Sequence, residues 1–105
     1  MIRGEKHPGG TLEYSLRGEP QASFTIFFSP ALDRLPHPYF GVLELDPRYL
    51  FVFAAGVLLS NGLAAGSFTI PSDPAIVGWR IGWQAFLVET ARPRLTNREL
   101  CTITE

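Results

Sequence analysis

The sequence predicts an all-β fold: an antiparallel β-sandwich, jelly-roll-like, with about seven to eight short strands. The 9 prolines and 10 glycines fall between apolar segments and divide the chain into pieces of strand length. Several of these pieces alternate apolar and polar residues with a period of two. No piece carries a sustained helical stripe with capping residues, so helix is the minority element throughout.

Two segments near the start of the chain show the alternation most clearly. Residues 11–18 and residues 22–29 each place apolar side chains at every second position. A strand with one wet face and one buried face gives this pattern, so we expect both segments to form such strands. The apolar positions are Leu12, Tyr14, Leu16, Phe24, Ile26 and Phe28.

The stretch from residue 30 to residue 39 contains three prolines. Proline lacks the N–H that a central strand must donate, so we expect a surface loop here, with one helical turn at residues 31–35. A strand over residues 40–45 follows, and the pair Asp46-Pro47 ends it with a turn.

Residues 49–59 form the longest apolar run, 11 residues in all. Apolar residues on both sides predict a strand that is either buried on both faces or bent across the core, with a bend or bulge at residues 54–56, where Gly56 interrupts it. Ser60, Asn61 and Gly62 then give the strongest turn signal, because Asn-Gly readily adopts the positive φ of a tight hairpin. A strand over residues 63–70 is expected to return from it.

Residues 77–88 predict a strand with two unequal faces. A helix here would hold two glycines in its interior, which disfavours it. We interpret Trp79 and Trp83 as core residues, because they share their face with other apolar side chains. The alternative is an exposed pair about 13 Å apart, at ~3.3 Å per residue, on which a sugar would stack. The apolar face comprises Val77, Trp79, Ile81, Trp83, Ala85 and Leu87.

A closing strand is expected within residues 93–104. Leu100 and Thr102 alternate there with Cys101 and Ile103. Cys101 is the only cysteine, so no internal disulfide forms, and we expect it to act as a small buried hydrophobe.

Length and composition bound the organisation of the chain. Its 105 residues predict one β-sandwich domain over residues 11–105, preceded by a flexible arm over residues 1–10. The net charge of -1 and the scattered basic residues argue against nucleic-acid binding, and we interpret Arg92, Arg94 and Arg98 as the solvated rim of a turn. The apolar run is too short for membrane insertion, and the first ten residues lack the apolar region of a signal peptide.

Residues of catalytic or metal-binding type are isolated in the sequence. His7 and His37 each precede a proline and lie outside any nucleophile or zinc motif. Glu13 and Glu44 fit the solvated faces of strands, and the aspartates at positions 33, 46 and 73 fit turn chemistry. We therefore expect no catalytic residues, no metal site and no cofactor.

The second half of the chain carries a recognisable motif series. Glycine 62 is followed by "IPSDPAIVG" over residues 70–78, then by Gln84-Ala85 and by Leu95-Thr96-Asn97. This series resembles a C-terminal β-domain of unknown function that is common at the ends of predicted secreted proteins of planctomycetes and myxobacteria. The chain departs from that family in lacking its middle cysteines and in having Glu89 where aspartate is usual. The resemblance implies an extracellular β-sandwich appended to larger proteins, and it carries over no catalytic residue.

The residue types of this motif point to structural roles. We expect Pro71 and Pro74 to fix a turn that Asp73 closes by accepting a hydrogen bond from a backbone N–H. Gly78 would let the chain enter the sheet closely. The amide of Gln84, opposite the tryptophan face, is expected to bond the backbone of a neighbouring loop. Asn97 would do the same at the last turn.

The sequence thus favours a non-enzymatic module of an extracellular or cell-surface protein that acts in adhesion, targeting or assembly. Its partners would be other protein domains or copies of itself. One alternative is a self-assembling subunit of a filament or coat, joined by strand exchange or edge-to-edge pairing. A second is a carbohydrate-binding module. That alternative requires Trp79, Trp83 or the three tyrosines Tyr14, Tyr39 and Tyr49 to be exposed in a row.

Overall fold

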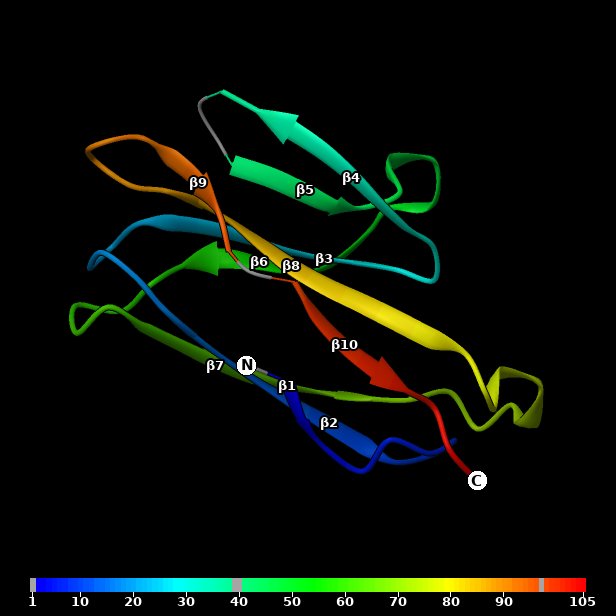
Figure 1. Cartoon of the computed structure of the whole chain (residues 1–105). Helices are drawn as coiled ribbons and strands as arrows, with labels where there is room; N and C mark the ends of the chain where they lie inside the picture. Colours follow the sequence, from blue (N-terminus) through cyan, green and yellow to red (C-terminus); the bar gives the residue numbers. More distant parts are fainter. Residues whose placement is uncertain (1, 39–40, 97) are drawn as a thin grey trace.

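The computed structural model describes residues 2–38, 41–96 and 98–105. Ten strands and two short 3₁₀ helices occupy these residues, and every strand pairing is antiparallel. Two sheets lie face to face, and a two-stranded hairpin lies beside the larger one (Figure 1). The predicted all-β sandwich is confirmed, with more strands than expected.

The smaller sheet contains the first strands of the chain. Its central strand is β2 (Thr11–Arg17), flanked by β1 (Ile2–Gly4) and β7 (Leu63–Thr69). The register of β1 sets Ile2 opposite Tyr14. Residues 2–4 therefore belong to the sheet, which differs from the flexible arm expected over residues 1–10.

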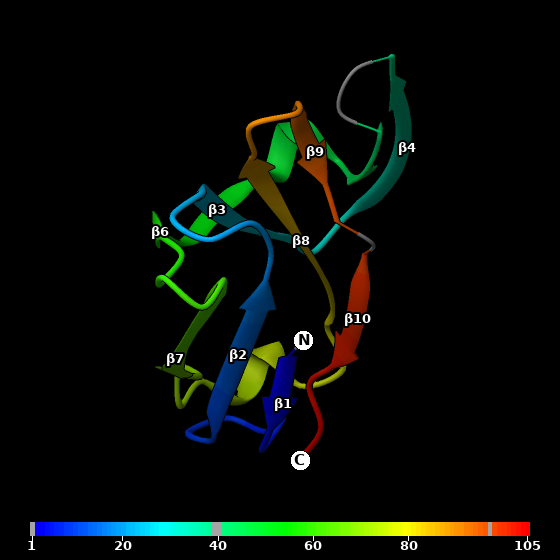
Figure 2. The ribbon, with the colours of Figure 1, turned by 90° about the vertical axis from the view of Figure 1, so that its left-hand side faces the viewer.

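The larger sheet has the order β10-β8-β3-β6. It comprises β3 (Ser23–Ser29), β6 (Phe51–Val57), β8 (Arg80–Val88) and β10 (Glu99–Thr102), and β9 (Pro93–Leu95) pairs with the far end of β8. In Figure 2, β2 and β7 form one layer and β3, β6 and β8 form the other. The strands predicted from period-two alternation at residues 11–18, 22–29 and 77–88 are thus confirmed, within a few residues at their ends.

The proline-rich stretch is a strand, so the predicted surface loop with a helical turn is wrong. Strand β4 (Leu32–His37) has a single strand partner among the described residues, β5 (Gly41–Leu45). A strand with a single neighbour needs only half of its amides for pairing, which is why Pro36 is tolerated within it. All of β4 is exposed, and this exposure fits an edge position.

The hydrophobic core lies between the two sheets. The smaller sheet contributes Leu12, and the larger sheet contributes Phe24, Ile26, Trp83 and Leu87, all of them buried. Phe24 and Ile26 are two residues apart on β3, and the buried Ala85 lies midway between Trp83 and Leu87 on β8, as expected for one face of a strand. The core therefore uses the apolar faces that the sequence identifies.

An aromatic cluster joins the two sheets. The ring of Phe53 on β6 lies 4.7 Å from that of Trp83 and 5.1 Å from that of Phe68 on β7, with both pairs edge to face. It also lies 5.6 Å from the ring of Tyr14 on β2. Such pairs contribute ~0.5–1.5 kcal/mol each beyond the area they bury. The cluster thus connects β6 to both layers.

The other face of β8 is covered by the β4–β5 hairpin. A Cβ added at Gly82 would lie 2.6 Å from Cδ2 of Leu45 and 2.7 Å from Cδ2 of Leu32. Glycine at position 82 lets the hairpin pack this closely. Gln84 is buried on the same face, so the middle of β8 is enclosed on both sides.

Strand β6 lies at the edge of the larger sheet, so the predicted burial on both faces is wrong. Its side chains are exposed or only partly buried, and Val52 is 62 % exposed. The expected irregularity is present one residue earlier than predicted, because the register with β3 passes from Ala54 to Val52 and skips Phe53. An apolar segment reveals its strand propensity but not its place in the sheet, which explains the error.

The turn after β6 connects the two sheets. Gly62 has φ 78°, and the side-chain oxygen of Asn61 accepts a hydrogen bond from the backbone N–H of Leu63 at 3.1 Å. The turn at residues 60–62 is therefore confirmed. It joins strands of different sheets, however, so the tight hairpin expected here is wrong.

Gly62→Ala and Gly78→Ala form a matched pair that tests this turn. Both glycines have positive φ, 78° and 91°, so alanine is strained at either position. At Gly62 the added Cβ would also clash with the carbonyl oxygen of Gly18, whereas at Gly78 it meets open space. We expect Gly62→Ala to lower the free energy of unfolding by more than ~3 kcal/mol and Gly78→Ala by ~1 kcal/mol. Equilibrium urea denaturation measures both changes, and equal losses would contradict this role of Gly62.

Candidate functional site

The IPSDPAIVG motif forms a capped turn at one end of the sandwich. The 3₁₀ helix η2 (Pro74–Ile76) begins with Pro74, and the Oδ1 atom of Asp73 accepts a hydrogen bond from the backbone N–H of Ala75 at 2.9 Å. The predicted role of Asp73 is thus confirmed. Gly78 adopts φ 91°, but a Cβ there would meet no atom within 4 Å. It serves the positive φ of the turn rather than the close approach that the sequence suggests.

The two tryptophans have different environments. Trp83 is 5 % exposed, and its Nε1–H donates to the Sγ atom of Cys101 at 3.3 Å. The predictions of core positions for Trp83 and Cys101 are confirmed. Trp79 is 50 % exposed, so the same prediction is wrong for it. Trp79 lies just before β8, which begins at Arg80, and its carbonyl oxygen accepts a hydrogen bond from the backbone N–H of Ile103 at 2.9 Å, so the backbone pairing reaches Trp79 although its side chain is half exposed.

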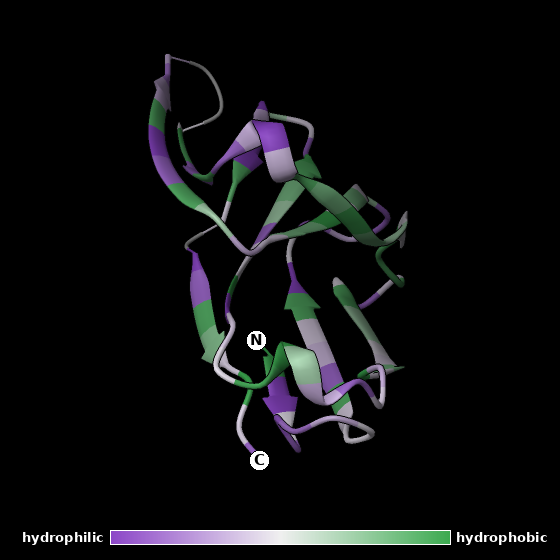
Figure 3. Cartoon of the chain, turned by 90° about the vertical axis from the view of Figure 1, so that its right-hand side faces the viewer, coloured by the Kyte–Doolittle hydropathy of each residue, from purple (hydrophilic) through white to green (hydrophobic). Residues whose placement is uncertain are grey.

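A cavity of about 160 Å³ lies between the sheets beside η2. We call it the η2 cavity. Trp83 forms part of its inner wall, and the half-exposed Trp79 lines it as well. Figure 3 shows this end of the sandwich, with hydrophobic segments on both layers around the turn. Its lining consists of apolar residues: Leu12, Phe28, Phe68, Ile70, Pro71, Ile76, Trp79, Ile81, Trp83 and Ile103.

Gln84 is a buried structural link to the β4–β5 hairpin. Its Nε2 donates to the carbonyl oxygens of Val42 at 2.7 Å and Thr96 at 2.8 Å. Its Oε1 accepts from the backbone N–H of Glu44 at 2.9 Å. The predicted bonding of Gln84 to neighbouring backbone is confirmed, and these partners occupy both amide N–H groups. Asn97, for which the sequence suggests a similar role, lies outside the described residues.

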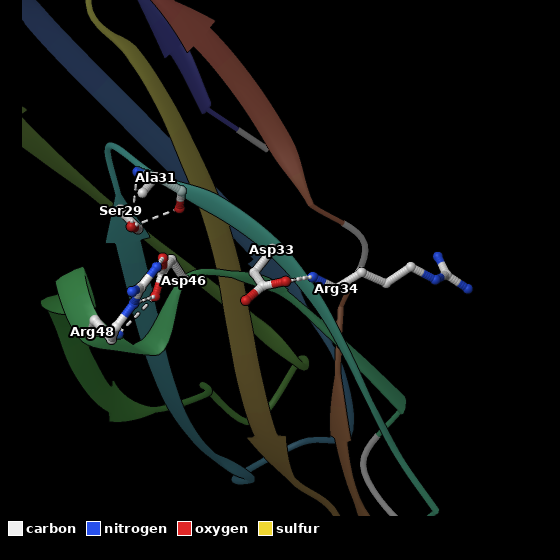
Figure 4. Close-up of polar contacts among 6 residues, drawn as sticks. All are labelled: Ser29, Ala31, Asp33, Arg34, Asp46 and Arg48. Atoms are coloured by element: carbon white, nitrogen blue, oxygen red, sulfur yellow. Dashed lines mark hydrogen bonds and ion pairs between the residues drawn. The ribbon is translucent and has the colours of Figure 1, made fainter.

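Carboxylates hold turns together at several places. Asp46 accepts hydrogen bonds from the backbone N–H of Arg48 at 2.9 Å and from its guanidinium at 2.7 Å (Figure 4). These bonds from Arg48 lower the pKa of Asp46. The figure also shows Oδ1 of Asp33 accepting from the backbone N–H of Arg34. Asp46 and Asp73 therefore serve turn geometry, as the sequence predicts, whereas Asp33 lies within strand β4 and the predicted turn role is wrong for it.

Glu89 connects the turn after β8 to the turn after β2. It accepts hydrogen bonds from Nε of Arg94 and, at 2.8 Å, from the backbone N–H of Glu19. The hydrogen bond from Arg94 makes the largest contribution to lowering the pKa of Glu89, and the bond from the Glu19 N–H lowers it further. Because the pKa of Glu89 is lower in the folded state, its ionised carboxylate stabilises the fold. This stabilisation is present above the ordinary glutamate pKa and is lost as the pH falls through the folded-state pKa. Arg94 thus belongs to an ion pair.

The histidines and the two strand glutamates do not converge. His7 lies near the surface, where hydrogen bonds with the Pro8 carbonyl and then with Glu5 raise its pKa, while His37 is exposed on β4. Glu13 lies on β2 and Glu44 on β5, in different layers. Within residues 2–38, 41–96 and 98–105, no three His, Cys, Asp or Glu side chains gather in a way that could hold a metal ion.

The sandwich has one edge without charged residues. From residue 49 to residue 72 the sequence contains no Asp, Glu, Lys or Arg, and this stretch includes all of β6 and β7. We call β6, β7 and the turn between them the apolar edge. Several of its large side chains are exposed. They are Phe51, Val52, Val57, Leu59, Leu63 and Phe68. Sequence reasoning missed this surface because it interpreted the absence of charge as a sign of burial.

Comparisons of the chain with protein-family models, with curated proteins and with solved structures give no significant match. The sequence motifs and the geometry are therefore the basis for a functional proposal. Among the described residues, no helix has the length and apolarity that a membrane span requires.

Replacing each tryptophan by alanine compares how much the buried Trp83 and the half-exposed Trp79 contribute to the free energy of unfolding. We expect Trp83→Ala to lower the free energy of unfolding by ~3–5 kcal/mol, the range for a buried large aromatic side chain. Trp79→Ala is expected to lower it by ~1 kcal/mol, because half of the side chain is already in water. Chemical denaturation followed by far-ultraviolet circular dichroism measures both. Comparable losses in the two variants would show that Trp79 is packed as tightly as Trp83.

Proposed function

We propose that this chain is a non-enzymatic β-sandwich module that acts in assembly, by pairing strand β6 with a strand of a second copy. The observation that carries the proposal is the apolar edge. Strand β6 has β3 as its one strand neighbour in the described part of the chain, so alternate N–H and C=O groups face outward. Such a row of backbone groups is a template for another strand.

The other edge strands carry the residues that discourage strand pairing. Strand β4 contains Asp33, Arg34 and Pro36, and β10 contains Glu99. Charges and proline at an edge oppose addition of a further strand. Strands β6 and β7 have neither. The contrast within one molecule indicates that the open edge serves pairing.

A second copy is the partner that this edge fits best. Two identical β6 strands can pair antiparallel about a two-fold axis. Each β6 residue of one copy then lies opposite a β6 residue of the other copy. No like charges oppose each other in that arrangement, because β6 has none. The exposed side chains of Phe51, Val52 and Val57 would then leave water on both copies.

The setting of the module is proposed on the resemblance at residues 62–97. That resemblance favours an extracellular or cell-surface protein of which this domain is one part, where assembly would serve adhesion or targeting. Filament or coat growth is the variant in which both β6 and β7 pair with further copies. The carbohydrate-binding alternative has less support, because Trp83 is buried and Tyr14 packs against the core. Tyr39, another member of the suggested row, lies outside the described residues.

Val52→Lys tests the assembly directly. Val52 is 62 % exposed on β6, so lysine fits the monomer, while a charge in a paired strand opposes association. We expect the native chain to show a rise in mass across a hundredfold concentration range by size-exclusion chromatography with light scattering. The variant is expected to need at least a tenfold higher concentration for the same rise.

Leu100→Lys is the matched control. Leu100 is exposed on β10, the opposite edge of the same sheet, so this variant is expected to associate like the native chain. Thermal denaturation of both variants verifies that they fold. A native chain that stays monomeric throughout contradicts the proposal. So does association that Val52→Lys leaves unchanged, because another surface would then form the contact.

A further inference from the structure

We infer that the η2 cavity binds a small apolar ligand, namely one aromatic ring or a branched hydrocarbon of similar size. This inference is independent of the assembly proposed for β6. It rests on the lining, the volume and the access of the cavity. Each of these restricts the class of ligand.

The lining excludes polar ligands. Every residue that lines the cavity is apolar, and the polar group of one of them is already bonded, because the Nε1–H of Trp83 donates to Cys101. A sugar, nucleotide or carboxylate would lose its hydration here without gaining hydrogen bonds from charged or amide side chains. A hydrocarbon has no such requirement, so the site selects for ligands without polar groups.

The volume limits the size of the ligand. The cavity measures about 160 Å³. An engineered apolar cavity of roughly 150 Å³ stays dry and binds benzene. One six-membered ring therefore fills the η2 cavity, whereas a long acyl chain would extend out of it.

The inner wall of the cavity is preformed. Leu12, Ile70, Trp83 and Ile103 are all buried, and they come from both sheets and from the C-terminal segment. Their positions are fixed by the core of the sandwich, so binding requires little reorganisation of this wall. A preformed wall reduces the entropy that binding must overcome.

The outer wall offers a path for entry. Ile76 on η2 is partly buried, and Phe68 and Trp79 are 39 % and 50 % exposed. The η2 turn holds Ile76 in place through the hydrogen bond between Asp73 and Ala75. A ligand can pass between these three side chains without breaking a strand pairing.

Titration with toluene tests the inference. In ¹H–¹⁵N correlation spectra of the native chain, we expect saturable shifts at the Trp83 indole N–H and at the amides of Ile70 and Ile103. The Val52→Lys variant is titrated in parallel, so that a result on the cavity does not depend on association through β6. Glucose serves as the polar probe and is expected to cause no saturable shift at these signals.

Ile76→Phe fills the cavity from its outer side and is expected to weaken toluene binding at least tenfold. Val88→Phe is the matched control, because Val88 is exposed and does not line the cavity, and it should bind toluene like the native chain. If Ile76→Phe does not fold, dissolved xenon and its ¹²⁹Xe shift report on the native cavity instead. Absence of saturable shifts with toluene and xenon would overturn the inference. So would toluene binding that is equal in folded Ile76→Phe and in Val88→Phe.

Discussion

The packing of Trp83 against Phe53 and Phe28 is the interaction on which the rest of this structure depends. Strand β8 lies inside the larger sheet, and Trp83 projects from its middle into the space between the layers. Its ring lies 4.7 Å from that of Phe53 and 5.3 Å from that of Phe28. Through Phe53 the contact reaches Phe68 on the opposite sheet. One buried indole therefore sets the spacing of the two layers.

This packing also affects which apolar surfaces are left uncovered, at the edge of β6 and at the η2 cavity. Phe53 is the bulged residue of β6, and its ring secures the strand to the core from one side. The other side of β6 is left open, with Val52 and Val57 in water. At the far end of the same core, the side chains around Trp83 do not fill the space below η2, and the cavity results. The apolar edge and the cavity thus both adjoin this aromatic cluster, because Phe53 lies on β6 and Trp83 lines the cavity.

Local patterns in the sequence predicted what depends on local chemistry. Period-two alternation located β2, β3 and β8, and the turn residues Asp73 and Gly62 have the conformations that their side chains favour. The bonding of Gln84 was also predictable, because an amide opposite an apolar face needs backbone partners when it is covered. These features require knowledge of a few neighbouring residues only.

Such local patterns do not predict the order of the strands in the sheet. An apolar segment such as β6 can lie at the centre or at the edge, and only the pairing of distant strands decides between them. Proline-rich β4 was missed for the same reason, since an edge strand tolerates proline where a central strand does not. Trp79 lines the η2 cavity together with Ile81 and Trp83 but is half exposed, and alternation along one strand does not show how much the other layer covers each position.

Hydrogen–deuterium exchange at low and high protein concentration tests whether the outer edge of β6 pairs with a second copy. If Phe53 holds β6 so that its outer edge pairs with a second copy, amides within Phe51–Val57 exchange more slowly as the concentration rises. Amides of Glu99–Thr102 at the opposite edge of the sheet should exchange at a rate that does not change with concentration. Exchange in β6 that is equally fast at every concentration would contradict pairing through this strand.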